Sequence, residues 1–241
     1  MTSVSIVVPM RNEAGNIADL ARGIATACAD LEAYEIIIVD DGSSDETAQI
    51  ARDLSTEIPQ LKLVQHPQSG GQSAAVHSGV QAAQSPIICT LDGDGQNPPS
   101  ELPKLFTPLL QDQTGQLALV AGQRVGRQDT LSKRLASRFA NGLRSWMLKD
   151  GTRDTGCGHK GFRRDAFLAL PYFDHMHRYL PALFKRDGWQ IALVDVRHEE
   201  RHSGRSNYSN LQRGLVGIYD LIGVAWLIRR RKKARPMDAR T

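Results

Sequence analysis

The amino-acid sequence predicts an α/β protein with a doubly wound, mainly parallel sheet. Over about the first 120 residues, short apolar runs of strand length alternate with longer helical patterns. The run at 35–39 shows no polar alternation, as expected for a parallel strand covered by helices on both faces. Polar residues directly follow three of the runs, and such sheets bind ligands outside the carboxyl ends of their strands. The fold and the location of its site are therefore predicted together.

The elements are predicted in a regular order. Strands are expected at 4–9, 35–39, 61–64, 86–91 and 117–122. Helices are expected at 16–31, after the cap candidates at 43–45, at 72–84 and at 98–110, and Asn16 is the expected N-cap of the first. The second half is less regular, with a basic helix at 131–149, a glycine-rich loop at 152–162 and a strand at 189–196.

Size and charge narrow the class of protein. A chain of 241 residues can bury one substantial core. Residues 229–241 carry seven Lys or Arg and one Asp, which leaves 23 basic against 25 acidic residues elsewhere. The basic character belongs to the tail and does not indicate a nucleic-acid groove. Three widely spaced cysteines favour a reducing compartment, and we expect neither a signal peptide nor a membrane span.

The stretch 91–99 carries the strongest chemical signal. Asp92 and Asp94 follow the fourth predicted strand, and two carboxylates so close are unfavourable unless a cation lies between them. Such hard oxygen ligands suit Mg²⁺ or Mn²⁺, which take further ligands from water and substrate phosphates. A solvated turn is the alternative, but polar residues at the other strand ends favour a site. Those residues are Asn12, Glu13, Asp40 and Asp41. Neither a dinucleotide-binding glycine motif nor a P-loop is present.

These stretches together resemble glycosyltransferase family 2, and within it the polyprenyl-phosphate (dolichyl-phosphate) mannose synthases. The resemblance covers about residues 4–208 and rests on VVPMRNE at 7–13, VDDGSSD at 39–45, DGDGQNPP at 92–99 and GQR at 122–124. The segments GHKGF at 158–162 and RHSGRSNY at 201–208 fit the lipid-phosphate branch. Many mannose synthases read roughly D-P-x-S-G-F where this chain has DTGCGHKGF at 154–162, so the sugar is not implied.

The resemblance implies a GT-A fold and the inverting, metal-dependent transfer of a hexose from a GDP- or UDP-linked sugar to a polyprenyl phosphate. A phosphate monoester is already an oxyanion near neutral pH, so it needs cationic positioning rather than a general base. The implied metal ligands are Asp92, Asp94 and Gln96, and the implied nucleotide-binding residues are Pro9, Asn12, Glu13, Asp40, Asp41 and Asp92. The implied acceptor-binding residues are Arg124, Arg138, Arg201 and Ser206, and the implied catalytic set is Asp94, Arg124, Arg138, Arg201 and Lys160.

The C-terminal part predicts a helix at a membrane surface. Leu211, Leu215, Ile218, Ile222 and Trp226 fall on one helical stripe, and a polybasic run follows at 229–235. This combination fits a helix lying among the headgroups of an anionic leaflet, while a dimer interface in a homo-oligomer is the alternative. We therefore expect a GT-A domain at 1–208 and an interfacial helix with a tail at 209–241. Such a protein would lie in the cytoplasm on the inner face of the cell membrane and serve the cell envelope.

Three other functions share features with this sequence. A family 2 transferase acting on a saccharide or lipid hydroxyl would need a general base, for which Asp154 is a weak candidate. A nucleotide-sugar-binding protein without catalysis would be expected to have a broken metal motif, whereas this motif is complete. Nucleotidyltransferases usually carry a Gly/Lys-rich first loop, which residues 10–13 do not supply. In the loop, we expect His159 to be structural and Cys157 to be a buried apolar side chain.

Overall fold

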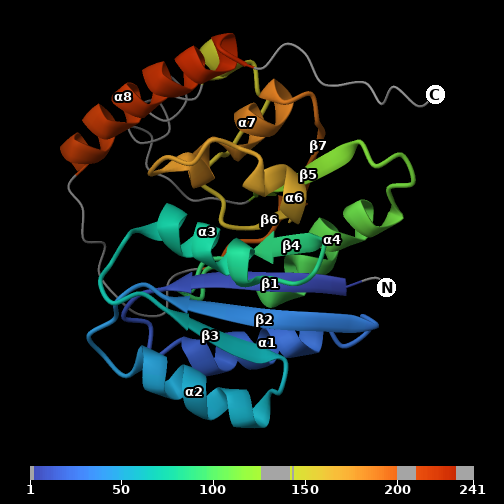
Figure 1. Ribbon diagram of the computed structural model, residues 1–241, viewed down its shortest axis with the longest axis vertical. Coiled ribbons are helices and arrows are strands. Elements are labelled where there is room, and N and C mark those ends of the chain that lie inside the picture. The colour runs from blue at the N-terminus through green and yellow to red at the C-terminus, as the bar shows by residue number, and fades with distance from the viewer. Residues whose placement is uncertain (1–2, 126–141, 143, 200–209, 232–241) are drawn as a thin grey trace, which may run out of the picture.

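The computed structural model describes residues 3–125, 142, 144–199 and 210–231, with backbone only at 210–216 (Figure 1). Its centre is a seven-stranded sheet in the order β3-β2-β1-β4-β6-β5-β7. The strands are β1 (Ser3–Met10), β2 (Ala33–Asp40), β3 (Leu61–Gln65), β4 (Ile87–Thr90), β5 (Leu117–Arg124), β6 (Lys160–Arg163) and β7 (Gln190–Val196). Every strand pair is parallel except those of β6, which runs antiparallel to β4 and β5. The predicted doubly wound, mainly parallel sheet is confirmed.

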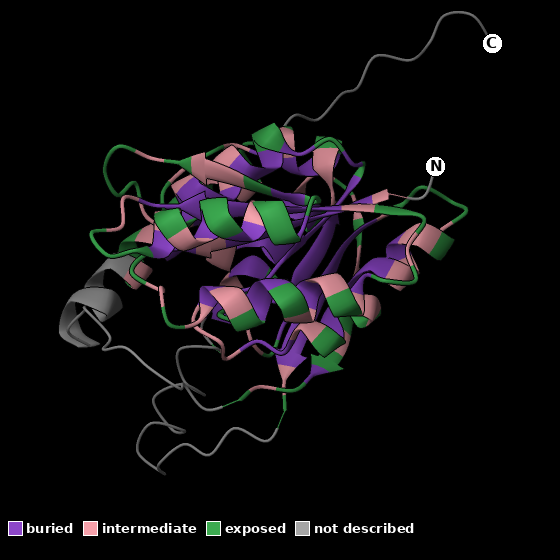
Figure 2. Ribbon diagram, turned by 90° about the horizontal axis from the view of Figure 1, so that it is seen from below, coloured by how far each residue is buried: buried purple, intermediate pink, exposed green. Residues whose placement is uncertain are grey.

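Helices cover both faces of the sheet, and their inner sides are buried while their outer sides are exposed (Figure 2). One face is covered by α1 (Ile17–Ala27), α2 (Thr47–Glu57), the 3₁₀ turn η1 (Pro99–Glu101) and α4 (Leu102–Gln111). The other is covered by α3 (Gln72–Ala82), α6 (Arg164–Leu168), the 3₁₀ turn η2 (Met176–Arg178), α7 (Leu180–Arg186) and α8 (Asn210–Arg229). The domain therefore has three layers.

The unbroken apolar run of β2 follows from these two cores. Ile36 and Ile38 pack with the α1, α2 and α4 side, whereas Ile37 and Val39 pack with the α3 side. Because successive side chains of a strand point to opposite faces, each face of β2 needs its own apolar set. Most of β2 is thus buried on both faces, as the sequence predicts.

Strand β6 is the main departure from the predicted fold, because the sequence predicts a loop over all of 152–162. The short run Lys160–Arg163 instead fills the gap between β4 and β5, and Gly161 lies opposite Cys89 and Val120. A Cβ on Gly161 would come within 2.7 Å of the Leu105 carbonyl oxygen. The glycine that suggested a loop therefore allows α4 to pack closely on the sheet.

The start of α1 also differs from the prediction. Asn16 stands at the N-cap position, but its side chain caps no backbone N–H and donates to Glu13 Oε2 at 2.6 Å. At the start of α2 the N-cap position is Glu46, which makes no side-chain cap, so none of the candidates at 43–45 is the N-cap. Asp45, the residue before it, still accepts a hydrogen bond from the Thr47 N–H at 3.0 Å. Most of the predicted basic helix at 131–149 lies outside the described residues, but 144–148 are helical.

Helix α8 packs on the domain with one side and leaves another exposed. Leu221 and Val224 join the core, and Asp220 Oδ2 lies 3.1 Å from His175 Nδ1. Large apolar side chains on its outer side are more than half exposed, namely Ile218, Tyr219, Ile222 and Trp226. Three of them belong to the predicted stripe, while the side chains of Leu211 and Leu215 lie outside the described part. Among the helices that the structure describes, none has the length and apolar character needed to cross a bilayer.

Candidate functional site

The carboxyl ends of β1 and β2 are joined by hydrogen bonds. The Asp41 N–H donates to the Met10 carbonyl at 2.8 Å, and the Asn12 N–H donates to Ser43 Oγ at 2.9 Å. Asn12 Oδ1 accepts the Ser44 N–H at 2.8 Å. Asn12 has φ of 57°, a left-handed conformation that asparagine tolerates better than most residues. The polar residue predicted for the nucleotide pocket therefore also connects the two loops at this edge.

Asp41 is buried, and its carboxylate is surrounded by the loop at 66–71. Oδ1 accepts the Gly70 N–H at 2.8 Å and lies 2.7 Å from His66 Nδ1. Oδ2 accepts from Ser69 Oγ at 2.7 Å and from the Gly71 N–H at 2.9 Å. Burial alone would raise the pKa of Asp41, but the hydrogen bonds, led by that of Ser69, outweigh it and lower the pKa. Asp41 is therefore a stable anion that holds this loop.

Asp40 is also built into the scaffold. It is 2% exposed, and its two oxygens accept from the Ser43 N–H at 3.1 Å and from Gln65 Nε2 at 3.3 Å. The Glu13 N–H donates to Thr47 Oγ1 at 2.9 Å, which fixes the end of β1 against α2. The four polar residues that follow β1 and β2 thus lie together, as the parallel sheet predicts.

The loop held by Asp41 leads directly to the end of β4. Gly71 has φ of 86°, which favours glycine, and Gln72 begins α3 immediately after it. Gln72 Nε2 donates to Asp92 Oδ1 at 2.7 Å. Gln72 is not among the site residues predicted from the sequence, where its one signal is its place after a glycine pair at a predicted helix start.

Asp92 lies in surroundings opposite to those of Asp41. The backbone at Gly158 approaches so closely that an added Cβ would lie 2.3 Å from Asp92 Oδ2. Burial and the neighbouring charge of Asp94 raise the pKa of Asp92, and the positive charges of Lys160 and Arg124 offset this only in part. The carboxylate pair is therefore short of positive charge, which a bound cation would supply.

The donor set at this end of β4 fits a hard divalent ion. Among the described residues, no group of three or more His, Cys, Asp and Glu side chains is arranged to hold a metal. Two carboxylates suit an ion that completes its shell with water and phosphate oxygens, as Mg²⁺ and Mn²⁺ do. Gln96 is adjacent, since its N–H donates to Asp94 Oδ1 at 3.1 Å, but its side chain donates to the Glu199 carbonyl at 3.4 Å.

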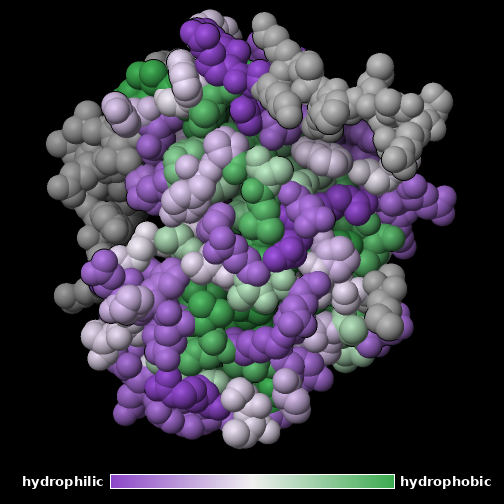
Figure 3. Space-filling model, in the orientation of Figure 1, coloured by the Kyte–Doolittle hydropathy of each residue, from purple (hydrophilic) through white to green (hydrophobic). Residues whose placement is uncertain are grey.

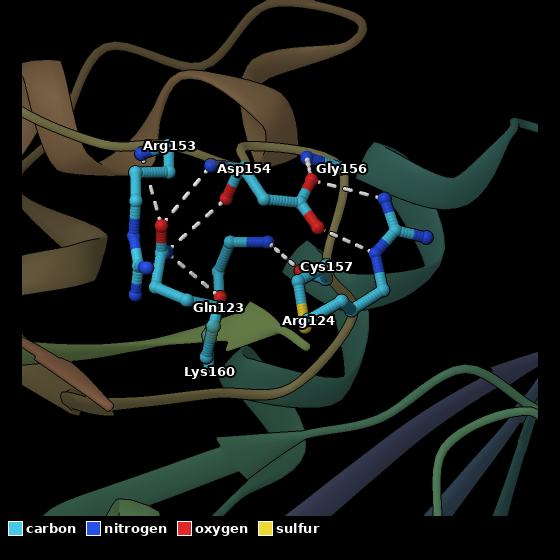
Figure 4. Close-up of polar contacts among 8 residues, drawn as sticks. Gln123, Arg124, Arg153, Asp154, Gly156, Cys157 and Lys160 are labelled. Carbon is cyan, nitrogen blue, oxygen red and sulfur yellow. Dashed lines mark hydrogen bonds and ion pairs between the residues drawn. The ribbon is translucent and has the colours of Figure 1, made fainter. Parts of the chain in front are cut away.

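The segment at 153–157 is fixed over the same edge by the end of β5 (Figure 4). Gln123 is buried, and its Oε1 accepts the N–H groups of Arg153 and Asp154 at 2.9 and 3.0 Å. Arg124 pairs with Asp154 through Nε–Oδ2 at 2.5 Å and Nη2–Oδ1 at 2.9 Å. Burial would raise the pKa of Asp154, but Arg124 lowers it overall. Asp154 is therefore a weak proton acceptor.

Lys160 brings a buried positive charge to Asp92. It is 4% exposed, its Nζ donates to the Cys157 carbonyl, and burial lowers its pKa despite the nearby carboxylates. A cavity of about 20 Å³, sufficient for one water-sized group, is lined by Lys160, Asp92, Pro9 and His177. Cys157 is buried as predicted, and burial raises the pKa of its thiol.

His159 lies under this loop. It is fully buried, its carbonyl accepts the Gly122 N–H at 2.9 Å, and neither ring nitrogen has a hydrogen-bond partner in the described part of the chain. Burial lowers its pKa to about 4, so the ring is neutral at physiological pH. This placement fits the expectation that His159 has a structural role.

The structure brings together most of the predicted site. Asp92, Asp94, Lys160, Arg124 and Pro9 lie around the ends of β1, β4 and β5. Three predicted residues, Arg138, Arg201 and Ser206, lie outside the described residues.

Comparisons with known sequences identify relatives over most of the chain. Residues 5–170 match the family model described as Glycosyl transferase family 2. The chain is 34% identical over 223 residues to the undecaprenyl-phosphate 4-deoxy-4-formamido-L-arabinose transferase of Sodalis glossinidius, covering 91% of this chain and 66% of the relative. The protein of the same name from Edwardsiella ictaluri is 32% identical over 222 residues, with the same coverage. The chain thus spans about two thirds of the length of these relatives.

Solved structures share the fold. Mannosyl-3-phosphoglycerate synthase from Rubrobacter xylanophilus superposes with a TM-score of 0.70 at 17% identity, covering 98% of this chain and 79% of that chain. Glucosyl-3-phosphoglycerate synthase from Mycobacterium tuberculosis, in complex with Mn²⁺, UDP-glucose and glycerol 3-phosphate, gives 0.66 at 21% identity, covering 95% and 80%. These likenesses confirm the GT-A fold that the sequence analysis expects.

Proposed function

Because the chain belongs to glycosyl transferase family 2, we propose that it transfers a sugar from a nucleotide diphosphate to a polyprenyl phosphate, with inversion at the transferred carbon. The named activity of the relatives supports a polyprenyl-phosphate acceptor. The proposed sugar is a hexose, and the arabinose derivative in the relatives' names is the alternative donor. Mannose itself has no support from these names.

The observation that carries the proposal is the placement of Asp92 beside Lys160 and Arg124. A departing nucleoside diphosphate develops negative charge, and these residues gather around the point where a charged ligand would complete the site. Asp92, Asp94 and Gln96 would hold Mg²⁺ or Mn²⁺, which when bound supplies positive charge to the leaving group. Lys160 adds a positive charge that is held in place by the Cys157 carbonyl.

The acceptor side is proposed to depend on arginine. The pair with Asp154 uses Nε and Nη2 of Arg124, and Nη1 remains for an oxygen of the acceptor phosphate. Arg138, Arg201 and Ser206 are proposed to join it. The hydroxyl-acceptor alternative needs a carboxylate that takes a proton. Asp154 is a poor candidate because its pKa is lowered by Arg124.

The nucleotide is proposed to lie at the ends of β1 and β2. Pro9, Asn12 and Glu13 would line its pocket directly. The carboxylates of Asp40 and Asp41 already accept hydrogen bonds from the surrounding loops, so we propose that they shape the pocket through those loops.

The two-part organisation is also a proposal. Residues 1–208 would form the catalytic domain, and 209–241 would hold it on the inner face of the cell membrane from the cytoplasm. The support is the apolar outer side of α8, where Ile218, Ile222 and Trp226 are more than half exposed, together with the basic residues that follow.

The test is a donor panel. The full chain is incubated with undecaprenyl phosphate, Mn²⁺ and radiolabelled GDP- and UDP-linked hexoses, with the 4-formamido-arabinose nucleotide as a further donor. One label should become organic-extractable, and ¹H NMR of the product should show an inverted anomeric centre. Asp94→Ala serves as the control for background transfer. Failure of every donor to label the lipid, while the nucleotide still binds, would contradict the proposal.

A further inference from the structure

A basic groove lies at the end of the molecule where α7 and α8 meet, far from α2 at the opposite end (Figure 1). Its volume is about 600 Å³, within the range of ligand-binding clefts. Its walls come from the helix at 144–148 with Lys149, from α7 and from the last turns of α8. Its lining includes the apolar side chains Trp146, Leu148, Ala182, Ala225 and Ile228 and the basic side chains Lys149, Lys185, Arg186, Arg229 and Arg231.

The charge of this groove is of one sign. No acidic residue lines it, and within the described residues Lys149, Lys185 and Arg229 form no ion pair with a carboxylate. Arg186 has a structural role, since it pairs with Asp187 at 2.8 Å and donates to the Leu227 carbonyl at 3.0 Å. Lys149, Lys185 and Arg229 are exposed, and together they give the groove a positive potential that attracts a negatively charged group.

The end of α8 defines how such a group would be held. The C-terminus of a helix presents carbonyl oxygens and a partial negative charge, so the backbone there repels an anion. Binding must therefore come from Lys and Arg side chains around the groove, which suit phosphate oxygens.

The groove also has an apolar wall that opens to the surface. Trp146 is 75% exposed although it lines the groove. Ile222 and Trp226 do not line the groove, but both are more than half exposed on α8. Figure 3 shows strongly hydrophilic residues beside hydrophobic ones at this end of the molecule. Inorganic phosphate would leave this apolar surface in water. A ligand with a phosphate and a hydrocarbon chain would cover both parts.

We propose that this groove binds the headgroup of one anionic phospholipid molecule, with the phosphate among Lys149, Lys185 and Arg229 and the first part of an acyl chain against Trp146. The inference rests on the proposed membrane location and sharpens it, because it assigns a saturable lipid site instead of general attraction to a charged surface.

The experiment uses a short-chain lipid that stays monomeric in water. The full chain is titrated with dihexanoyl phosphatidylglycerol by isothermal calorimetry, with dihexanoyl phosphatidylcholine and inorganic phosphate as comparison ligands. We expect one site per chain and at least tenfold weaker binding of both comparison ligands. Equal binding of phosphatidylcholine, or a titration that does not saturate at one lipid per chain, would overturn the proposal.

Matched variants locate the site. Lys185→Gln and Lys149→Gln should each weaken binding about fivefold, the effect expected for one basic residue near an anionic lipid. Arg52→Gln removes the same charge from α2 at the opposite end and should change binding less than twofold. Equal weakening by Arg52→Gln and Lys185→Gln would refute the groove, and thermal melts check that each variant is folded.

Two parallel measurements separate other outcomes. Sedimentation at the same concentrations tests whether a second copy covers the groove. A dimer that Lys185→Gln dissociates and that does not bind the lipid would overturn the proposal.

Sugar transfer by the unmodified protein to detergent-dispersed polyprenyl phosphate tests the proposed function separately. If the protein binds the phosphatidylglycerol but transfers no sugar, only the enzyme assignment is refuted. If it transfers sugar but does not bind the phosphatidylglycerol, only the lipid site in the groove is refuted.

Discussion

The ends of β2 and β4 carry similar residues in opposite surroundings. Each strand is buried, and each is followed by an aspartate at the same edge of the sheet, Asp41 after β2 and Asp92 after β4. Asp41 has hydrogen-bond donors around both oxygens and a lowered pKa. Asp92 has a neighbouring carboxylate, accepts a hydrogen bond from the Gln72 amide, and has a raised pKa. The first carboxylate is completed by the protein, and the second is left for a ligand.

This difference indicates that one aspartate at the sheet edge stabilises the fold, whereas the other is available to bind a ligand. A buried anion with a full set of donors stabilises the loops around it, because its charge is satisfied in the folded chain. A partly buried anion such as Asp92, placed beside another anion, destabilises the empty protein, and its charge is stabilised when a cation binds. Substitutions at the two positions should therefore separate stability from activity.

The largest effect is expected at the end of β4. Asp92→Asn should reduce sugar transfer about 1,000-fold, because stabilisation of a leaving group by a bound metal is worth several kcal/mol. The free energy of unfolding without metal should stay the same or rise, since the variant removes a charge that burial disfavours. Turnover is measured with saturating Mn²⁺ and unfolding with urea. Turnover within tenfold of the unsubstituted protein would contradict this role for Asp92.

The reverse pattern is expected at the end of β2. Asp41→Asn should lower the free energy of unfolding by about 3 kcal/mol, because asparagine has one acceptor oxygen where four donors converge. Transfer per folded molecule should change far less. Because the folded-state pKa of Asp41 is lowered, its contribution is full above the unfolded value of 3.8 and is lost as pH falls through the folded pKa. The variant should therefore show less acid destabilisation in urea unfolding at about pH 3. If Asp92→Asn lowered the free energy of unfolding as much as Asp41→Asn does, the two aspartates would not differ in their contribution to stability.

The sequence could predict both aspartates but not the difference between them. Each belongs to a contiguous pattern in which a buried strand is followed by a polar turn. The deciding partners come from elsewhere in the chain. Gly70 and Gly71 are about 30 residues from Asp41, and Gln72 is 20 residues from Asp92. Contacts between residues so far apart in the chain form only in the folded sheet, so a local sequence pattern does not predict them.

The loop that covers Asp92 also makes contacts that the sequence did not predict. Its glycines suggested an irregular segment, but Gly161 lies in β6 and Gly158 lies against the Asp92 carboxylate. The resemblance implied Arg124 and Lys160 as site residues, and Asp154 was considered only as a weak general base. The sequence could not show that Arg124 and Asp154 pair with each other. Fold class and strand ends were therefore predictable from periodicity, whereas the pairing of charges was not.

His159 differs from Asp41 in having no hydrogen-bond partner for its side chain among the described residues. Its ring is buried under the loop. The folded pKa is about 4 and the ordinary value is 6.5, so the folded state resists protonation. Its contribution to stability is full above 6.5 and is lost as pH falls towards 4. Between about pH 7 and about pH 5, His159→Gln should lose roughly 2 kcal/mol less unfolding free energy than the unsubstituted protein. Equal losses, measured by urea unfolding at each pH, would contradict a buried neutral ring.

The smallest expected effect belongs to Gln72, which connects the two ends. Its amide is carried by the loop that Asp41 holds, and it donates to Asp92 Oδ1 at 2.7 Å. Loss of one such hydrogen bond is worth about 1 kcal/mol, so Gln72→Ala should lower kcat about fivefold. Gln49→Ala removes the same side chain from the surface of α2 and should leave kcat unchanged. Because Gln72 acts through the position of Asp92, the Mn²⁺ concentration for half-maximal activity should rise in Gln72→Ala and not in Gln49→Ala. A fall in kcat without that rise would show that Gln72 acts independently of the carboxylate.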